Sequence, residues 1–176
     1  MLDFIRIICA VPAVKVGDVK KNAQDICNMM EEADRVGADA VLFPEMALTG
    51  YTCGDLFFQD ALWNAVKDGL KEIAFVSGKH PNITSVVGLP VRTAMGLLNA
   101  AAVISNGTIE GFTAKTYLPD YGESNESRWF STAQEGTAVT LAGETLFVGT
   151  QTLYPLADTL VGIEICEDLF APIAPS

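Results

Sequence analysis

Apolar and polar positions near the start of the chain follow two different periods. Residues 4–10 form a short apolar run closed by Pro12, which predicts a buried strand. One helical face then collects the apolar residues Val19, Ala23, Ile26, Cys27, Met30, Ala33 and Val36. Asp18 suits the N-cap of this helix and Gly37 its C-cap. Residues 40–43 predict another buried strand, so the order strand–helix–strand favours parallel pairing with a crossover helix.

Farther along, the pattern gives one more helix and then changes to strand periodicity. Residues 60–76 predict a helix whose inner face carries Leu62, Ala65, Val66, Leu70 and Ile73. Strands are predicted at residues 84–91, 100–105, 108–114, 139–141, 145–148 and 159–166. Asn106-Gly107 is a two-residue hairpin signal, and residues 116–134 are polar and irregular. The whole pattern predicts an α/β protein with helices covering one face of a sheet.

Composition and charge narrow the class of protein. The 176 residues suit one domain with a proper core, and 49% of them are hydrophobic. A net charge of -11 argues against a nucleic-acid partner, because phosphate binding needs clustered Lys and Arg. No apolar run is long enough to cross a bilayer, and the first residues lack the pattern of a secretory leader, so no membrane partner is expected.

The four cysteines are widely spaced and form no CxxC pair. With His80 as the single histidine, a Cys/His metal site is not expected, and free thiols favour a cytoplasmic location. Cys9 and Cys27 fall on apolar faces and are predicted to lie in the core. Cys53 lies in a predicted loop, where packing explains it better than chemistry does.

Three chemically useful side chains each follow a predicted strand. Glu45 comes after Leu42-Phe43-Pro44, Lys115 after residues 108–114, and Cys166 at the end of residues 159–166. Taken singly, each residue is explained by an ordinary structural role, since exposed charges and buried thiols are common. Together they predict an acyl-transfer site, in which Lys115 lowers the pKa of the thiol and donates to an oxyanion. Because His80 lies in a turn-like stretch before Pro81, the general base is predicted to be Glu45.

The segments that carry these residues resemble a known superfamily. LFPEMALTGY around Glu45, TAKTYLP around Lys115 and GIEICEDL around Cys166 resemble, in order and spacing, the nitrilase (carbon–nitrogen hydrolase) superfamily. TGYTCGDLF, KTYLPDYGESNESRWF and the Glu167-Asp168-Leu169 that follows the cysteine are similar to the glutaminase domain of glutamine-dependent NAD synthetases. The resemblance spans nearly the whole chain.

The resemblance implies a fold, an activity and a set of site residues. The family fold is an αββα sandwich. Glu45 would be the base, Lys115 the oxyanion stabiliser and Cys166 the nucleophile of glutamine hydrolysis. Glu126 matches the glutamate that orients the lysine. Tyr121, Glu167 and Phe170 match positions that line the glutamine pocket.

The resemblance also implies that two different domains carry out the two reactions. Ammonia from glutamine would pass to a separate synthetase domain that amidates deamido-NAD. ATP, Mg and deamido-NAD are therefore expected only there, with no cofactor or metal in residues 1–176. Family members are usually oligomeric, so a homo-oligomer is expected.

The chain ends ten residues after Cys166, so we expect a glutaminase domain that is incomplete at its C-terminus and lacks the synthetase domain. Family substrate contacts, a serine and an arginine, would lie beyond Ser176, and we expect this chain to be inactive alone. Two other hypotheses stay open. One is an amide hydrolase of the same superfamily that acts on an ω-amide or a carbamoyl group. The other is a non-catalytic scaffold or oligomerisation surface, because a truncated sandwich exposes apolar sheet.

Overall fold

The computed structural model describes residues 4–134, 136–141 and 143–175. Two helices, α1 (Val19–Arg35) and α2 (Asp60–Ser77), accompany nine strands in the described part of the chain. The strands are β1 (Ile7–Cys9), β2 (Ala40–Leu42), β3 (Thr84–Thr93), β4 (Gly96–Ser105), β5 (Thr108–Ala114), β6 (Ala138–Leu141), β7 (Glu144–Gly149), β8 (Leu153–Leu156) and β9 (Thr159–Gly162). Three short 3-10 helices span Gly54–Phe58, Glu126–Arg128 and Cys166–Phe170.

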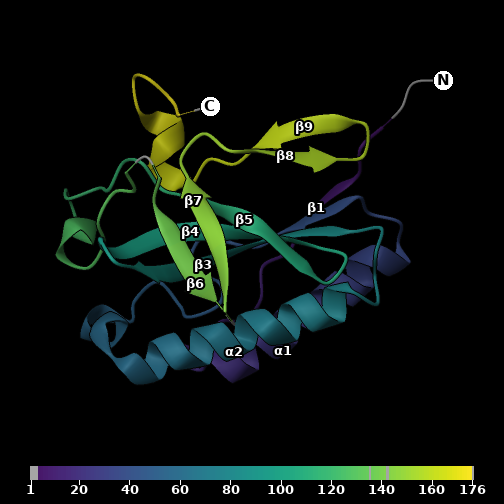
Figure 1. Cartoon of the computed structure of the whole chain (residues 1–176), viewed down its shortest axis with the longest axis horizontal. Coiled ribbons are helices and arrows are strands. Elements are labelled where there is room, and N and C mark those ends of the chain that lie inside the picture. The colour runs from purple at the N-terminus through teal and green to yellow at the C-terminus, as the bar shows by residue number, and fades with distance from the viewer. Residues whose placement is uncertain (1–3, 135, 142, 176) are drawn as a thin grey trace.

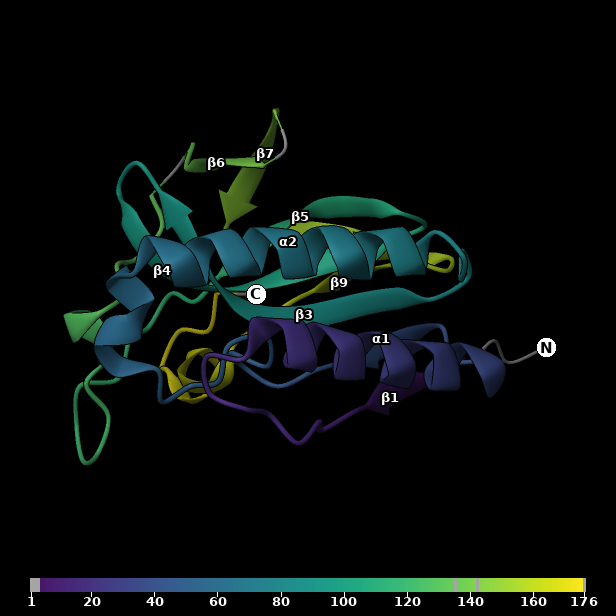
Figure 2. The same ribbon diagram turned by 90° about the horizontal axis from the view of Figure 1, so that it is seen from below.

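Seven strands form one mixed sheet in the order β1-β2-β3-β4-β5-β7-β6. β1, β2 and β3 are mutually parallel, as are β5 and β7, whereas β3–β4, β4–β5 and β6–β7 are antiparallel. Both helices lie on one face of this sheet, and the β8–β9 hairpin lies on the other (Figures 1 and 2). The described residues thus form a helical layer, a sheet and a small second sheet, as an α/β sandwich requires.

The main core fills the space between the helices and the sheet. Asp18 starts α1 as predicted, because its side chain accepts a hydrogen bond from the Lys21 backbone N–H at 3.2 Å. Ile26 and Met30 on α1 and Ile73 on α2 are fully buried. Each such side chain contributes about 1.5–3 kcal/mol of transfer free energy, so the two helices are firmly attached to the sheet.

A second, smaller core lies on the opposite face, under the β8–β9 hairpin. Tyr154 of β8 packs there with Val86, Val103 and Ile165. The Tyr154 hydroxyl lies 3.1 Å from that of Thr113, and burial raises the pKa of Tyr154. This packing brings the chain that follows the hairpin back across the sheet, next to the ends of β2 and β5.

The structure confirms both helices and the hairpin at Asn106-Gly107, where both residues have positive φ, 46° and 82°. Residues 84–91, 100–105, 108–114, 139–141 and 145–148 lie in strands as predicted. α1 ends at Arg35 with Val36 as its C-cap, and Gly37 follows with φ 73°.

Several expectations were wrong, and one strand was missed. β1 is shorter than residues 4–10 and is exposed, because it is an edge strand, so Cys9 is exposed instead of in the core. Val36 is half exposed, because it caps the helix and does not continue its buried face. The strand predicted at 159–166 ends at Gly162. β8 was not predicted, since Pro155 interrupts it, and a proline is tolerated there because the hairpin is only two strands wide.

Neither of the two helices described is long and apolar enough to cross a membrane.

Candidate active site

Glu45 is held in place by the close approach of its loop to β3. The Phe43 N–H donates to the Val86 carbonyl at 2.9 Å, and the Leu48 N–H donates to the Gly88 carbonyl at 3.1 Å. A Cβ atom at Gly88 would lie 2.3 Å from the Pro44 carbonyl oxygen and 2.6 Å from the Met46 nitrogen. Glycine is therefore required at position 88 for Glu45 to reach its position.

We expect Gly88→Ala to lower the free energy of unfolding by about 1–3 kcal/mol, because the new methyl group would overlap backbone atoms that cannot rotate away. Urea denaturation measures this change. Gly78→Ala is the matched control, since φ is -63° at Gly78 and the nearest atom to an added Cβ is 3.4 Å away. Equal stability of the two variants would contradict the steric argument.

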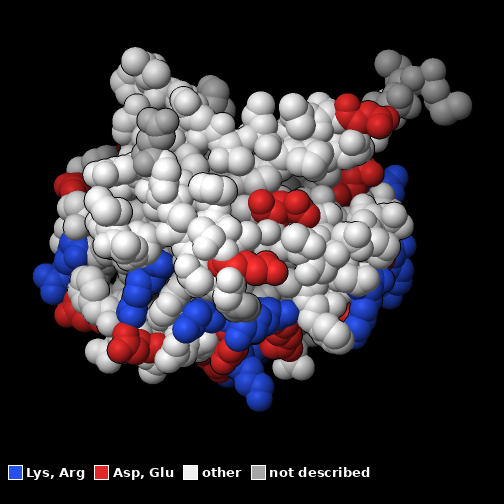
Figure 3. Space-filling model, viewed as in Figure 1, with Lys and Arg blue, Asp and Glu red and all other residues white. Residues whose placement is uncertain are grey.

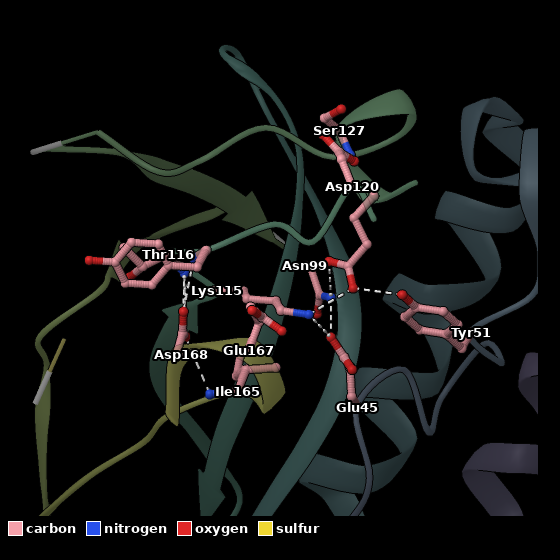
Figure 4. A network of polar contacts seen from close by, with 12 residues as sticks. Glu45, Tyr51, Asn99, Lys115, Thr116, Asp120, Ser127, Ile165, Glu167 and Asp168 are labelled. Carbon is pink, nitrogen blue, oxygen red and sulfur yellow. Dashed lines mark hydrogen bonds and ion pairs between the residues drawn. The ribbon is translucent and has the colours of Figure 1, made fainter. Parts of the chain in front are cut away.

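Lys115 follows β5 and points into the protein, where its side chain is fully buried. Its Nζ donates to Glu45 Oε1 and to Glu126 Oε1, both at 2.7 Å (Figure 4). Burial by itself would lower the pKa of Lys115. The hydrogen bonds and charges of Glu126 and Glu45 outweigh that effect, so the pKa is raised. The ammonium therefore stays charged at neutral pH.

Glu126 is buried on the 3-10 helix Glu126–Arg128 and accepts hydrogen bonds from three side chains. Besides Lys115, the Tyr51 hydroxyl donates to Oε1 at 2.7 Å and Asn99 Nδ2 donates to Oε2 at 3.3 Å. Burial and the bond to Glu126 raise the pKa of Tyr51. This carboxylate is fully engaged by donors, so it holds Lys115 and is not available as a base.

Cys166 begins the 3-10 helix Cys166–Phe170 with φ 49°, a left-handed conformation that L-residues rarely adopt. Such strain costs about 1–3 kcal/mol and is typical of functional sites. Cys166 and Glu45 line the same cavity, with a volume of ≈ 130 Å³. The three side chains predicted to meet are therefore brought together, through Glu45, which contacts Lys115 and faces the thiol.

The electrostatics of the thiol differ from the prediction. Burial and the neighbouring Glu45 carboxylate, which also accepts a hydrogen bond from the thiol, raise the pKa of Cys166. Lys115 acts in the predicted direction and lowers it, but its effect is smaller than that of burial and Glu45 together. The thiol of Cys166 therefore keeps its proton near neutral pH, beside the Glu45 carboxylate.

Residues 7–174 match the carbon–nitrogen hydrolase family. The chain belongs to this family. Similar proteins include the glutamine-dependent NAD(+) synthetases of Mycobacterium tuberculosis, 33% identical over 98% of this chain and 26% of that protein, and of Xylella fastidiosa, 32% identical over 97% and 28%. The crystal structure of a glutamine-dependent NAD(+) synthetase from Cytophaga hutchinsonii superimposes with a TM-score of 0.79 at 32% identity, over 93% of this chain and 28% of that one.

An amidase from Nesterenkonia sp. AN1 shares the fold, with a TM-score of 0.71 at 19% identity over 96% of this chain and 60% of that one. The curated relatives are much longer than this chain, which spans about a quarter of their length. The α/β architecture of this chain is thus that of the nitrilase superfamily.

Asp168 is a residue of this carbon–nitrogen hydrolase whose role was missed in the sequence. In the sequence, Asp168 stands out only as part of the Glu167-Asp168-Leu169 segment that follows the cysteine. Its buried carboxylate accepts from the backbone N–H groups of Thr116 at 3.0 Å, Tyr117 at 2.9 Å and Ile165 at 3.3 Å. Asp168 therefore ties the segment after Lys115 to the strained turn at Cys166.

The predicted pocket residues lie around the turn that bears Cys166. The Tyr121 hydroxyl donates to Glu167 Oε2 at 2.7 Å, and this bond raises the pKa of Tyr121. Phe170 ends the same short helix and is 75% exposed. Tyr121 and Glu167 are thus brought together next to Cys166, whereas the contribution of Phe170 to a substrate pocket stays a prediction.

Proposed function

We propose that this chain is a glutaminase that hydrolyses the side-chain amide of glutamine through a thioester on Cys166. In the full-length protein its ammonia would serve the ATP-dependent amidation of deamido-NAD to NAD. The observation that carries the proposal is the buried Glu45–Lys115–Glu126 network beside a thiol on a left-handed turn. The similarity to glutamine-dependent NAD(+) synthetases over nearly the whole chain supports glutamine as the substrate.

Glu45 is the general base of the proposed reaction, and its two oxygens have different tasks. Lys115 and Asn99 both donate to Oε1, so Oε2 is left to take the thiol proton. Sulfur then attacks the amide carbon, and the carbonyl π electrons move to oxygen. Collapse of this intermediate breaks the C–N bond, and the nitrogen leaves as ammonia with the proton from Glu45. A water then gives its proton to Glu45 and attacks the thioester, and the departing sulfur recovers that proton.

Lys115 stabilises the negative charge that develops on the carbonyl oxygen. Two of its three N–H groups are held by Glu45 and Glu126, which leaves the third for the oxyanion. Because the carboxylates keep its pKa raised, the ammonium does not lose its proton to the intermediate. The protein supplies this charge in a fixed position, so little reorganisation is needed during the reaction.

Tyr121 and Glu167 are the proposed contacts for the amino-acid end of glutamine. The Glu167 carboxylate, held by the Tyr121 hydroxyl, offers a partner for an α-ammonium group. Phe170 would cover the aliphatic part of the substrate. An ω-amide lacking the ammonium would lose this ion pair, so profiling such substrates distinguishes glutaminase from a simpler amidase.

The substitution Glu45→Gln is expected to have opposite effects on two reactions of the Cys166 thiol. Loss of the adjacent negative charge lowers the pKa of Cys166, so iodoacetamide, which reacts with the thiolate, alkylates it at lower pH than in the wild type. Labelling by a diazo-norleucine, a glutamine-mimicking electrophile, falls by about 10²–10⁴-fold because the base is lost. Peptide mapping measures both, with the exposed Cys9 as internal reference. A shift of the alkylation profile to higher pH would contradict the assigned role of Glu45.

Diazo-norleucine labelling also tests the function itself. We expect a stoichiometric adduct on Cys166, competed by glutamine, and an adduct confined to another residue would refute the proposal. Labelling requires no turnover, which suits a chain that spans a quarter of its relatives' length. We propose that steady glutamine turnover needs the remaining part of the full-length protein, and sustained ammonia release by this chain would overturn that view.

Location and assembly form the last part of the proposal. Cys9, Cys27, Cys53 and Cys166 are all free thiols, which supports a reducing cytoplasm. Charged side chains gather over α1 and α2, whereas the region of the β8–β9 hairpin is mostly uncharged and exposes Leu153 and Leu160 (Figure 3). Such a face supports a homo-oligomer, which sedimentation tests directly.

A further inference from the structure

Asn99, in the middle of β4, contacts each of the three charged residues of the proposed site. Its Nδ2 donates to Glu45 Oε1 at 2.5 Å and to Glu126 Oε2 at 3.3 Å. Its backbone carbonyl accepts from the Lys115 N–H at 2.8 Å. Asn99 is almost completely buried, and Figure 4 shows it beside Glu45 and the end of the Lys115 side chain. Nothing in the sequence singles out Asn99, which lies among apolar residues just before the strand predicted at residues 100–105.

The orientation of the Asn99 amide shows which of its atoms matter. Oδ1 is buried and has no hydrogen-bond partner among the described residues, whereas both hydrogens of Nδ2 are directed at carboxylates. Leaving a buried acceptor unpaired is unfavourable, so the amide is held in place by its two donor bonds. A side chain of similar shape that lacks N–H donors could not bond to either carboxylate.

The charges around Asn99 explain why a neutral donor is suited to this position. Glu45 and Glu126 share one ammonium, that of Lys115, so the three side chains carry a net charge of about -1 with all groups ionised. A neutral N–H₂ group separates the two carboxylates and bonds to both without adding charge. A cation would cancel the negative charge that the base needs, and an acid would add to the repulsion.

We propose that Asn99 is a positioning residue that holds Glu45 in the orientation of a general base by bridging it to Glu126. This inference rests on the proposed hydrolase function and adds a residue to it. With Oε1 of Glu45 held by Asn99 and Lys115, the carboxylate cannot rotate, and Oε2 stays directed at the thiol of Cys166. Asn99 acts on the reaction through Glu45 and does not contact the substrate.

Two substitutions test the bridge by different means. Asn99→Leu keeps the volume and removes both donors. We expect the maximal rate of Cys166 labelling by diazo-norleucine to fall about 10–100-fold, with little change in the concentration that gives half of this rate, since misplacing a catalytic group by about 1 Å has such an effect. Asn99→Asp keeps the shape but adds a carboxyl group, which donates only when it is protonated.

The pH dependence of the labelling rate of Asn99→Asp distinguishes a positioning role from a merely structural one. A merely structural role would leave this pH dependence unchanged. Three carboxyl groups around one ammonium take up an extra proton, and the labelling-competent form is the one in which this proton restores a donor bond from residue 99 to Glu45. Labelling is therefore lost as this proton leaves, so the basic limb of the rate profile moves to lower pH. Asn99→Leu has no such proton, and its profile keeps the wild-type shape at a lower rate.

Two further asparagines serve as controls. Asn64→Asp introduces the same charge on the exposed surface of α2, and wild-type labelling is expected. Asn22 is a buried asparagine whose Nδ2 donates to the carbonyls of Lys15 and Leu48, so Asn22→Leu loses stability without touching the carboxylates. Circular dichroism checks the folding of every variant. If Asn99→Leu does not fold, the profile of Asn99→Asp decides the question alone.

The possible results separate the two proposals. A wild-type chain that is not labelled at Cys166 refutes the hydrolase function. A wild-type chain that is labelled, with Asn99 variants at wild-type rates or with an unshifted Asn99→Asp profile, refutes only the bridge. A loss of rate in Asn22→Leu equal to that in Asn99→Leu would also refute it, since general destabilisation would then explain both.

Discussion

Cys166→Ala abolishes covalent labelling by the glutamine mimic, which is the largest effect expected for this chain. The thiol is the only group at the site that can form the thioester, and the other three cysteines lie elsewhere, with Cys27 and Cys53 buried. Burial raises the pKa of Cys27 to about 12 and also raises that of Cys53, so neither offers a thiolate near neutral pH. Intact-mass spectrometry measures the result.

Cys9→Ala is the control for this experiment, because it removes an exposed thiol and leaves the site untouched. Full labelling of Cys9→Ala together with no labelling of Cys166→Ala assigns the nucleophile. Since alanine also adopts φ 49° with difficulty, a thermal unfolding curve should show that Cys166→Ala folds like the wild type. A residual adduct on a folded Cys166→Ala variant would place the nucleophile at another residue.

Lys115→Met has the second largest expected effect, on rate and on stability together. The substitution leaves Glu45 and Glu126 facing each other without the ammonium that both of them contact at 2.7 Å. Removing one partner from a buried ion pair typically lowers the free energy of unfolding by about 3–5 kcal/mol. Losing an oxyanion donor lowers the rate by about 10²–10³-fold. Urea denaturation and the labelling rate measure the two effects.

Lys71→Met on α2 is the matched control, since its ammonium is exposed and pairs with the exposed Asp68 on the same helix. The stability deficit of Lys115→Met should shrink on acidification, because protonation neutralises the two carboxylates that have lost the ammonium. A Lys115→Met variant as stable as Lys71→Met at neutral pH would contradict the buried network.

The elements of the fold that were predicted correctly are those decided by local periodicity. The apolar face of α1, its N-cap Asp18 and the turn at Asn106-Gly107 each follow from residues close together in the chain. The exposure of Cys9 did not follow, since an apolar run looks the same in a central strand and in an edge strand. Only the order of strands in the sheet distinguishes the two cases.

The residues of the candidate site also fall into two groups, those that the sequence predicts and those that only the folded structure reveals. Glu45, Lys115 and Cys166 could be proposed from the sequence because each follows an apolar strand-like run within a distinctive motif. Their roles stay proposals until the labelling experiments are done. Asn99 could not be proposed, since neither its spacing nor its neighbours in the chain distinguish it. Tyr51 lies within the segment LFPEMALTGY, but nothing in the sequence places its hydroxyl at Glu126. Their contacts with Glu126, 27 and 75 residues away in the chain, exist only in the folded state.

By itself, the sequence determined the helices, the β4–β5 hairpin and the three segments that carry the reactive side chains, because backbone propensity and side-chain period act over a few residues. The tertiary structure alone decided that the Cys166 turn is left-handed, that burial and the neighbouring Glu45 raise the pKa of the thiol, and that Asn99 and Asp168 connect the segments of the site. Burial and the effects of neighbouring charges act through space, so they can be assigned to a residue only when the chain around it is folded.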